Sequence, residues 1–404
     1  MSPLRAAWTL DPDIVFLNHG SFGACPRAVQ EAQGALRERM EANPVAFFTR
    51  ELEPRIDAAR AEVAEFVGAR PEDLAFVRNA TDGVNAVLAS ASLAPGDELL
   101  TTDHAYGACR NALAAFAERA GARVVVARVP FPLSGPGDIA EPVLAAVTAR
   151  TRLALLDHVT SPTGVVFPVA ELASSLAARG VRVLIDGAHA PGMLPLGLAA
   201  LGDAGVDWYT GNLHKAVCAP KGAGFLWARR DRQAALHPTT VSHGRTSTRA
   251  RPRLHEEFDW TGTDDPTPWL CAPVALRVMA ALLPGGWPAI LAANHELALR
   301  ARELLTEALG APRPTPDALV GSLVAVPLPP GSFTGPRFAN AVDPLQAALA
   351  ERHRIEVPVP LWPQPPARLV RVTAQLHVSL GDVARLARAL TEELARERDA
   401  RPAG

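Results

Sequence analysis

The sequence predicts an α/β protein with a large domain built on a mainly parallel, seven-stranded sheet and a small C-terminal α+β domain. Between about residues 72 and 228, seven short apolar runs alternate with amphipathic helical stretches, which is typical of parallel strands covered by helices on both faces. After about residue 272 a long helical stretch leads into short strands and further helices, and 404 residues are enough for two cores. We therefore expect an N-terminal arm over residues 1–20, a large domain over 21–271 and a small domain over 272–404.

The elements of the large domain follow from these patterns in chain order. Two helices come first, over about 26–42 and 54–67, and the proline in the first turn of the second fits because that position needs no N–H donor. Strands are expected at 74–77, 98–102, 123–129, 153–159, 182–188, 207–210 and 222–228. The helices between them are expected at 82–92, 106–120, 141–150 and 169–179.

The small domain shows a different pattern. A long helix is expected over 273–283 and 287–308, followed by strands near 323–327, 355–358 and 369–373. Helices near 344–353 and 381–396 complete it. The Pro/Gly-rich stretch 327–336 predicts a surface loop.

The composition narrows the class of protein. Hydrophobic residues make up 48% and charged residues 20%, and the net charge of −2 gives no reason to expect nucleic acid or an anionic membrane as a partner. We find neither a secretory signal nor an apolar run long enough to cross a bilayer, so we expect a cytoplasmic enzyme. The four cysteines are scattered without a C-x-x-C pair, which fits neither a zinc site nor a disulfide framework, and we expect no metal.

Lysine is nearly absent from the chain. Lys215 and Lys221 are the only two lysines, and arginine stands in their place everywhere else. The presence of two lysines is consistent with chance. Arginine, however, cannot replace a lysine that forms an imine, because its guanidinium is always protonated and delocalised. Lys221 lies in a turn before the expected strand 222–228, where a structural role is the simpler interpretation. Lys215 is therefore the candidate for covalent chemistry.

Polar residues gather at the carboxyl ends of the predicted strands, where an open parallel sheet binds its ligands. Residues 79–83 follow a strand and open a helix, so they offer a phosphate cradle or simply an N-cap. Asp186 and His189 end another strand, and a carboxylate there either holds a protonated pyridine nitrogen or caps the chain beside a core histidine. Residues 157–164 end the strand before it, and Lys215 follows the strand 207–210. Together these strand ends have the layout of fold type I enzymes that use pyridoxal 5′-phosphate (PLP).

Seven stretches carry a family resemblance: 17–23 (Leu-Asn-His-Gly-Ser-Phe-Gly), 79–85, 157–164, 186–192, 211–222, 260–269 and 371–375. On these motifs the chain resembles the class V aminotransferase superfamily, and within it the isopenicillin N epimerase-like branch. The resemblance implies the PLP-dependent transferase fold type I, PLP as cofactor, a small-molecule amino acid as substrate, and a homodimer whose active sites are shared between subunits. The chain departs from the family pattern at Thr373, at His377 and Val378, and at Ala216, which leaves the substrate open.

The resemblance also implies the roles of individual residues. Lys215 would hold the cofactor as a Schiff base and move the α-proton, Asp186 would pair with the pyridinium nitrogen, and His189 would bind the ring hydroxyl. Arg371 would clamp the α-carboxylate of the substrate with its planar fork. The phosphate would be held by Ala80 (through its N–H), Thr81, Asn212 and His214 and by Thr263 of the neighbouring subunit, and Ser161 falls at a polar contact to the cofactor.

Three assignments stay open at this point. Tyr106, in preference to His104, is expected to stack on the ring and act as a catalytic acid, and a buried tyrosine with a satisfied hydroxyl is the alternative. His19 either projects into the site to bind substrate or caps local backbone. The Arg- and His-rich segment 241–256 indicates a polar or acidic substrate side chain, and solvated loop charge explains it equally well.

Several reactions fit these residues. PLP stabilises an α-carbanion and the protein decides its fate. We expect an epimerase or racemase, with Lys215 on one face of the substrate and Tyr106 or His19 on the other. The alternatives are a C–S lyase acting on a cysteine conjugate or sulfoxide, an aminotransferase and, outside enzymes, a catalytically silent PLP-binding regulatory protein. A persulfide-forming desulfurase is disfavoured, because no cysteine follows Cys271.

Overall fold

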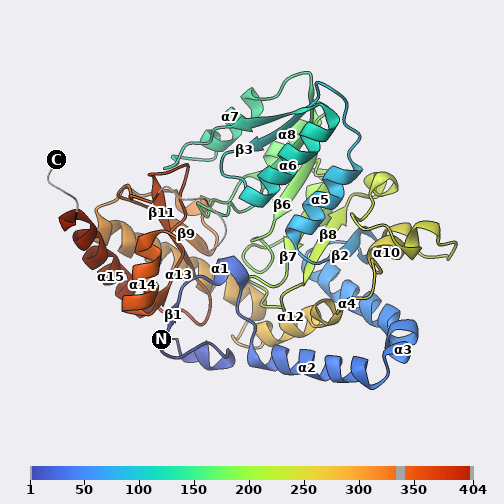
Figure 1. The fold of residues 1–404 in the computed structure, drawn as a ribbon, viewed down its shortest axis with the longest axis horizontal. Helices are drawn as coiled ribbons and strands as arrows, with labels where there is room; N and C mark the ends of the chain where they lie inside the picture. The colour runs from blue at the N-terminus through green and yellow to red at the C-terminus, as the bar shows by residue number, and fades with distance from the viewer. Residues whose placement is uncertain (1, 334–341, 401–404) are drawn as a thin grey trace.

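The computed structural model describes residues 2–333 and 342–400. It is organised around one mixed sheet, which has seven strands and lies between layers of helices (Figure 1). The strand order is β2-β8-β7-β6-β5-β3-β4. The bounds are β2 Leu74–Val77, β3 Glu98–Thr102, β4 Arg123–Ala127, β5 Thr151–Asp157, β6 Arg182–Gly187, β7 Trp208–Asn212 and β8 Gly224–Ala228. Each expected strand of the large domain is present, with its ends shifted by at most two residues.

The direction of the strands brings the candidate site residues to one edge. Strands β3 to β7 run parallel, whereas β8 pairs antiparallel with both β7 and β2. Two reversals return β2 to the direction of β7, so the segment after β2 lies at the same edge as the segments after β5, β6 and β7. The strand ends recognised in the sequence therefore converge.

Helices cover both faces of the sheet. The helices of the large domain are α2 Arg27–Ala42, α3 Pro44–Ala46, α4 Leu52–Phe66, α5 Ala80–Ser90, α6 Gly107–Ala120, α7 Gly137–Ala145, α8 Val169–Ala177, α9 Leu198–Asp203, α10 Arg253–Phe258, α11 Thr267–Leu270 and α12 Ala272–Ala280. The strands are buried on both sides: Leu155 packs with α5 and α6, whereas Leu156 packs in the core shared with α4 and α8.

The helix expected at 141–150 is wrong in its bounds, because α7 runs from Gly137 to Ala145. The buried carboxylate of Glu98 explains the early end. It accepts hydrogen bonds from Thr148 Oγ1 at 2.7 Å and Arg150 Nε at 3.1 Å, which holds the chain in a turn before β5. A contact 50 residues away in sequence thus overrides the local helical pattern.

The small domain has its own core. Strands β9 Leu323–Leu328 and β11 Arg368–Thr373 pair antiparallel, and α13 Gly286–Leu309 packs against both. Helix α15 Leu380–Asp399 packs against α13 and against α14 Pro344–His353. The N-terminal segment joins this domain, since β1 Val15–Phe16 pairs parallel with β10 Ile355–Glu356. Here β9 includes the first two residues of the expected loop 327–336, and residues 334–336 of that loop lie outside the described residues.

The expected domain boundary at residue 271 stays a prediction. Ala272, Ala275 and Leu276 of α12 pack in the core of the large sheet, so the packing change falls between α12 and α13. Val15 and Leu17 of the expected arm pack in the core of the small domain. The two terminal regions of the chain therefore build one unit.

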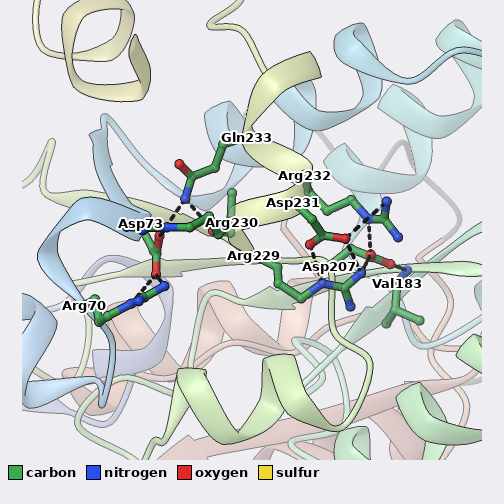
Figure 2. A network of polar contacts seen from close by, with 10 residues as sticks. Arg70, Asp73, Val183, Asp207, Arg229, Arg230, Asp231, Arg232 and Gln233 are labelled. Atoms are coloured by element: carbon green, nitrogen blue, oxygen red, sulfur yellow. Dashed lines mark hydrogen bonds and ion pairs between the residues drawn. The ribbon is translucent and has the colours of Figure 1, made fainter. Parts of the chain in front are cut away.

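The edge of the sheet opposite the candidate site is tied together by ion pairs (Figure 2). Asp207, just before β7, accepts hydrogen bonds from the N–H of Val183 at 2.8 Å and from Arg232 Nε at 2.6 Å, and pairs with Arg229 at 2.9 Å. Asp73, just before β2, accepts a hydrogen bond from Gln233 Nε2 at 2.8 Å. The segment after β8 thus fixes the amino ends of β6, β7 and β2.

None of the helices in the described residues is long and apolar enough to cross a membrane. Across residues 2–333 and 342–400, no group of three or more His, Cys, Asp or Glu side chains is arranged to hold a metal ion.

Candidate active site

A cavity of about 680 Å³ opens at the carboxyl ends of the parallel strands. It collects residues from four separate strand ends and from the starts of α5 and α6. The expected site residues that line it are Ala80, Thr81, Tyr106, Ser161, Asp186, His189, Asn212, His214 and Lys215. Arg371, His19 and Thr263 are not among the lining residues of this cavity in the described part of the chain.

Lys215 lies just after β7 with its amine enclosed. Burial lowers the pKa of its ammonium group from 10.5 to about 8, and the carboxylate of Asp186 opposes part of this shift. Its Nζ lies 3.1 Å from Nε2 of His189. Burial, reinforced by the nearby Lys215, lowers the pKa of His189 well below its usual value, so the imidazole is neutral. Near neutral pH the amine is therefore partly unprotonated, as a nucleophile requires.

Asp186 ends β6 at the floor of the cavity and is only 3% exposed. It accepts hydrogen bonds from the N–H of Ala188 at 3.0 Å and from the Cys109 thiol at 3.2 Å. No arginine, lysine or histidine in the described residues forms an ion pair with it. A buried carboxylate without a cation fits a ligand that brings its own positive charge, such as a protonated pyridine ring.

A second carboxyl group stands beside it. Asp157 is the partner of Asp186 in the register of β5 and β6 and is also 3% exposed. Burial and the neighbouring charge of Asp186 raise the pKa of Asp157 well above its usual value, which favours its protonated form. Sequence reasoning noted Asp157 only as a strand end and missed Cys109, because both depend on contacts across the sheet.

The N-terminus of α5 forms the opposite end of the cavity. Asn79 caps it by accepting the N–H of Asp82 at 3.0 Å, and Thr81 lies in its first turn. The N–H of Ala80, expected to bind phosphate, is taken by Asn212 Oδ1 at 2.8 Å in this structure. In the first turn of α5 the N–H of Thr81 has no hydrogen-bond partner among the described residues, and together with the helix dipole it makes this end of the cavity suited to a phosphate group.

His214 closes the same end. Its Nδ1 donates to the carbonyl of Ala223 at 3.1 Å, and burial lowers its pKa to about 4. The neutral ring therefore carries its proton on Nδ1 and presents an unprotonated Nε2. A bound phosphate dianion would favour protonation of this ring, since an opposite charge nearby raises the pKa of a histidine.

Tyr106 and His104 occupy different places. Tyr106 lines the cavity and is 39% exposed, and burial raises the pKa of its phenol. His104 is fully buried, with Nδ1 at 2.7 Å from Thr163 Oγ1 and Nε2 at 3.0 Å from the carbonyl of Val129. Of the two, Tyr106 lines the cavity and His104 does not, and stacking of Tyr106 on the cofactor ring stays a prediction.

Arg371 lies at the edge of the cavity, on β11 of the small domain. It donates to the carbonyl of Ser161 at 2.6 Å and to the hydroxyl of Ser21 at 2.8 Å, and its Nε has no partner in the described residues. Burial lowers the pKa of Arg371 to about 10, because no carboxylate compensates its charge. An enclosed guanidinium bonded only to neutral oxygens is suited to a carboxylate ligand.

The position of His19 differs from the expectation that this residue binds substrate. It is 1% exposed, and its Nε2 lies 3.1 Å from the carbonyl of Lys215 while its Nδ1 lies 3.0 Å from Nε2 of His377. It therefore supports the backbone beneath the lysine instead of reaching the substrate.

Thr263 is exposed and lines a neighbouring cavity of about 210 Å³ that shares Asp264 and Trp269 with the large one.

The segment 241–256 has most of its arginine charge neutralised locally. Arg249 pairs with Glu53 at 2.7 Å, and Arg251 pairs with Asp259 at 2.8 Å. None of this segment's residues lines the cofactor cavity in the described part of the chain. The structure thus favours the alternative that these charges serve the loop itself.

The sheet, the lysine, the unpaired carboxylate and the phosphate-binding helix terminus together define a PLP-dependent enzyme of fold type I. The donor set fits this cofactor, since Asp186 offers a buried carboxylate to the ring and the start of α5 offers the N–H and hydroxyl of Thr81 to the phosphate. The model of the aminotransferase class-V family matches residues 14–317, and the chain belongs to this family.

The similar proteins of named activity include isopenicillin N epimerases and L-cysteine desulfhydrases. The chain is 37% identical over 399 residues to an isopenicillin N epimerase of Streptomyces clavuligerus, covering 96% of each chain. It is 38% identical to the isopenicillin N epimerase of Amycolatopsis lactamdurans, covering 96% of this chain and 97% of that one. It is 34% identical to a putative L-cysteine desulfhydrase of rice, Oryza sativa subsp. japonica, covering 85% and 72%.

A solved structure shares the fold. The complex between the cystine C–S lyase C-DES and its product cysteine persulfide has a TM-score of 0.80, with 22% identity over 94% of this chain and 98% of that one.

Proposed function

We propose that this enzyme is an epimerase or racemase that inverts the α-carbon of an amino acid. The observation that carries this proposal is that Lys215 and Tyr106, a candidate base and a candidate acid, line the same cavity. The lysine has a pKa of about 8 and is partly unprotonated near neutral pH, whereas the tyrosine, with its pKa raised by burial, holds its proton. One base and one acid are the pair that removal and return of a proton require. The two similar isopenicillin N epimerases support this choice.

In this proposal the residues of the site bind the substrate, hold the cofactor or transfer the proton. Arg371 binds the substrate α-carboxylate, and Asp186, His189, Thr81 and the N-terminus of α5 hold the cofactor. When bound, PLP supplies an electron sink that stabilises negative charge at the α-carbon. Lys215 Nζ accepts the α-proton, and Tyr106 Oη returns a proton to the other side. The raised pKa of Asp157 disfavours a second negative charge beside Asp186 at the floor of the site.

β-Elimination is the second candidate, and the similarity to the rice desulfhydrase favours it. It needs only Lys215 as base and a sulfur leaving group on the substrate.

Desulfuration through a cysteine persulfide is less well supported, because burial raises the pKa of all four thiols and none is activated. Transamination stays an alternative, since Lys215 is also placed to move a proton to the cofactor.

A single experiment separates these reactions. The PLP-loaded protein is incubated with L-amino acids and cysteine conjugates in D₂O and followed by proton NMR. An epimerase replaces the α-proton by deuterium and forms the opposite enantiomer. In Tyr106→Phe we expect deuterium exchange to continue while inversion falls roughly 10²- to 10⁴-fold, the usual contribution of a positioned acid. Pyruvate and ammonia from both proteins at equal rates would establish a lyase and contradict the epimerase.

We also propose that the protein is a homodimer of the cytoplasm. Exposed apolar side chains support an interface: Phe22 at the cavity mouth is 72% exposed and Val45 between α2 and α4 is 68% exposed. The four cysteines are all free thiols, in keeping with a reducing compartment.

A further inference from the structure

A second cavity, of about 710 Å³, adjoins the cofactor cavity. Tyr106 and Ser161 line both cavities. Arg371 lines the second and donates to Ser161 and to Ser21, which lines the first. The guanidinium suited to the α-carboxylate therefore stands where the two cavities meet. A substrate held there has the second cavity available for its side chain.

Arg110 brings another cation to this second cavity. It lies in the first turn of α6, where its N–H donates to the carbonyl of Tyr106 at 3.0 Å. Residues four apart share one helix face, so Arg110 follows Tyr106 along the same side of α6. Its half-buried side chain makes neither an ion pair nor a hydrogen bond with any described residue.

The other polar groups of the second cavity leave an excess of donors. Asp343 is neutralised by Arg368 at 2.7 Å. The carboxylate of Asp103 accepts a backbone N–H at 3.0 Å and forms no ion pair with a described residue, but the two guanidinium groups of Arg110 and Arg371 outnumber it in this cavity. Gln346 uses Oε1 to accept a backbone N–H at 2.9 Å, which leaves its amide N–H groups free. Asn111 is exposed at the cavity wall beside Arg110. Free amide donors in the same cavity as an unpaired guanidinium are suited to an anionic ligand.

We propose that Arg110 binds a second carboxylate at the far end of the substrate side chain, and that the substrates are α-amino acids with a distal acidic group. This inference rests on the proposed function only for the placement of the α-carboxylate at Arg371. A small, uncharged side chain such as that of cysteine would fill neither the volume nor the charge of the second cavity. Arg110 is thus a specificity-determining residue for this enzyme.

The test compares two amino acids of equal length, L-2-aminoadipate, which ends in a carboxylate, and L-norleucine, which ends in a methyl group. Binding to the PLP-loaded enzyme is measured by the change in visible absorbance, and α-proton exchange in D₂O is measured on the same samples. The variants are Arg110→Gln and, as a matched control on the same helix, Arg119→Gln. Arg119 does not line either cavity in the described residues, and its guanidinium lies over the ring of Phe116 at 5.4 Å.

We expect the wild-type enzyme and Arg119→Gln to bind L-2-aminoadipate roughly tenfold to hundredfold more tightly than L-norleucine, the range for a hydrogen bond to a charged group. Arg110→Gln should lose this preference while keeping its affinity for L-norleucine. An unchanged preference in Arg110→Gln, no preference in the wild type, or binding of neither compound would overturn the inference. Preferential binding without α-proton exchange of either compound would support Arg110 and contradict the epimerase, so the two proposals fail separately.

Discussion

At the scale of single residues, burial sets the protonation states of this site. Lys215 and Arg371 are both enclosed without a directly bonded carboxylate, and the pKa of each falls, to about 8 and about 10 respectively. The two cations differ in use, because the lysine reaches a value at which it loses its proton near neutral pH and the arginine does not. Desolvation therefore makes a base of one and leaves the other a permanent carboxylate ligand.

The pKa of Lys215 predicts how the cofactor-free protein takes up PLP. Only the neutral amine attacks the aldehyde, so the uptake rate should rise with pH and level off above about 8, where an ordinary lysine with a pKa of 10.5 would continue to rise. Uptake is followed by visible absorbance after mixing at a series of pH values. Borohydride reduction and peptide mapping should place the label on Lys215 and none on Lys221, the only other lysine. A rate still rising at pH 10 would contradict the lowered pKa.

The site residues at strand ends could be predicted from the sequence, whereas the residues that act through contacts across the sheet could not. Lys215 and Asp186 were recognisable because strand ends of a parallel sheet share one edge. The raised pKa of Asp157 and the role of Arg110 as an unpaired cation depend on which groups lie within a few ångströms in the folded chain. No local pattern carries that information.

At the scale of elements, the turn after β7 is held from below by the N-terminal segment and the small domain. His19 Nε2 lies 3.1 Å from the carbonyl of Lys215, and Gln375 Nε2 donates to the carbonyl of Ala216 at 3.2 Å. Burial lowers the pKa of His19 to about 4, so the ring is neutral and Nε2 must carry its proton to donate to this carbonyl. Nδ1 then accepts the proton of His377 Nε2 at 3.0 Å.

This tautomer predicts different results for the glutamine and asparagine substitutions of His19. Glutamine places an amide nitrogen near the position of Nε2 and should keep the bond to Lys215, whereas asparagine is too short and should lose it. We expect His19→Asn to cost about 1–3 kcal/mol in the free energy of unfolding and to shift the pH midpoint of PLP uptake. His19→Gln should show a smaller loss of stability and the wild-type midpoint. Equal midpoints in both variants would show that His19 is structural and does not position the lysine.

The opposite edge of the sheet gives a stability prediction that leaves the site untouched. Asp207 is 3% exposed and bonds to Val183, Arg229 and Arg232 (Figure 2). Asp207→Asn should lower the free energy of unfolding by roughly 1.5–3 kcal/mol, because a buried charged acceptor of three donors is lost. The exposed Asp231, which pairs with Arg229 at 2.6 Å, serves as the control, and Asp231→Asn should cost less than about 1 kcal/mol.

Urea unfolding measures both variants, and the visible absorbance of the bound cofactor monitors the site. The absorbance should be unchanged in both, since the network lies at the amino ends of the strands. Equal losses of stability in the two variants would mean that burial does not strengthen the Asp207 network.

At the scale of the whole molecule, the fold was more predictable than the division into domains. Strand and helix periodicities are local, and they located the seven strands of the large sheet to within two residues at either end. Which core a segment joins is decided by packing between distant parts of the chain. For this reason local patterns do not show that Val15 and Leu17 pack in the core of the small domain, or that Ala272 packs in that of the large one.

The proposed homodimer can be tested through Thr263. Thr263 is exposed and lies outside the cofactor cavity of its own chain, so the proposed phosphate contact requires a second subunit. Thr263→Ala should weaken PLP binding roughly tenfold to hundredfold, the range for a hydrogen bond to a charged group. Light scattering should give the mass of a dimer for the wild type and for this variant.

Mixed dimers decide whether the contact is made between subunits. When Lys215→Ala and Thr263→Ala proteins are unfolded together and refolded, each hybrid dimer should contain one site with Lys215 from one chain and Thr263 from the other. Tight PLP binding should then return in the mixture, although neither variant shows it alone. The converse mixture, wild type with a chain carrying both substitutions, should lose tight binding at the wild-type Lys215 of each hybrid. If Thr263 acted within its own chain, the first mixture would gain nothing and the second would keep every wild-type site, and the shared active site would have to be abandoned.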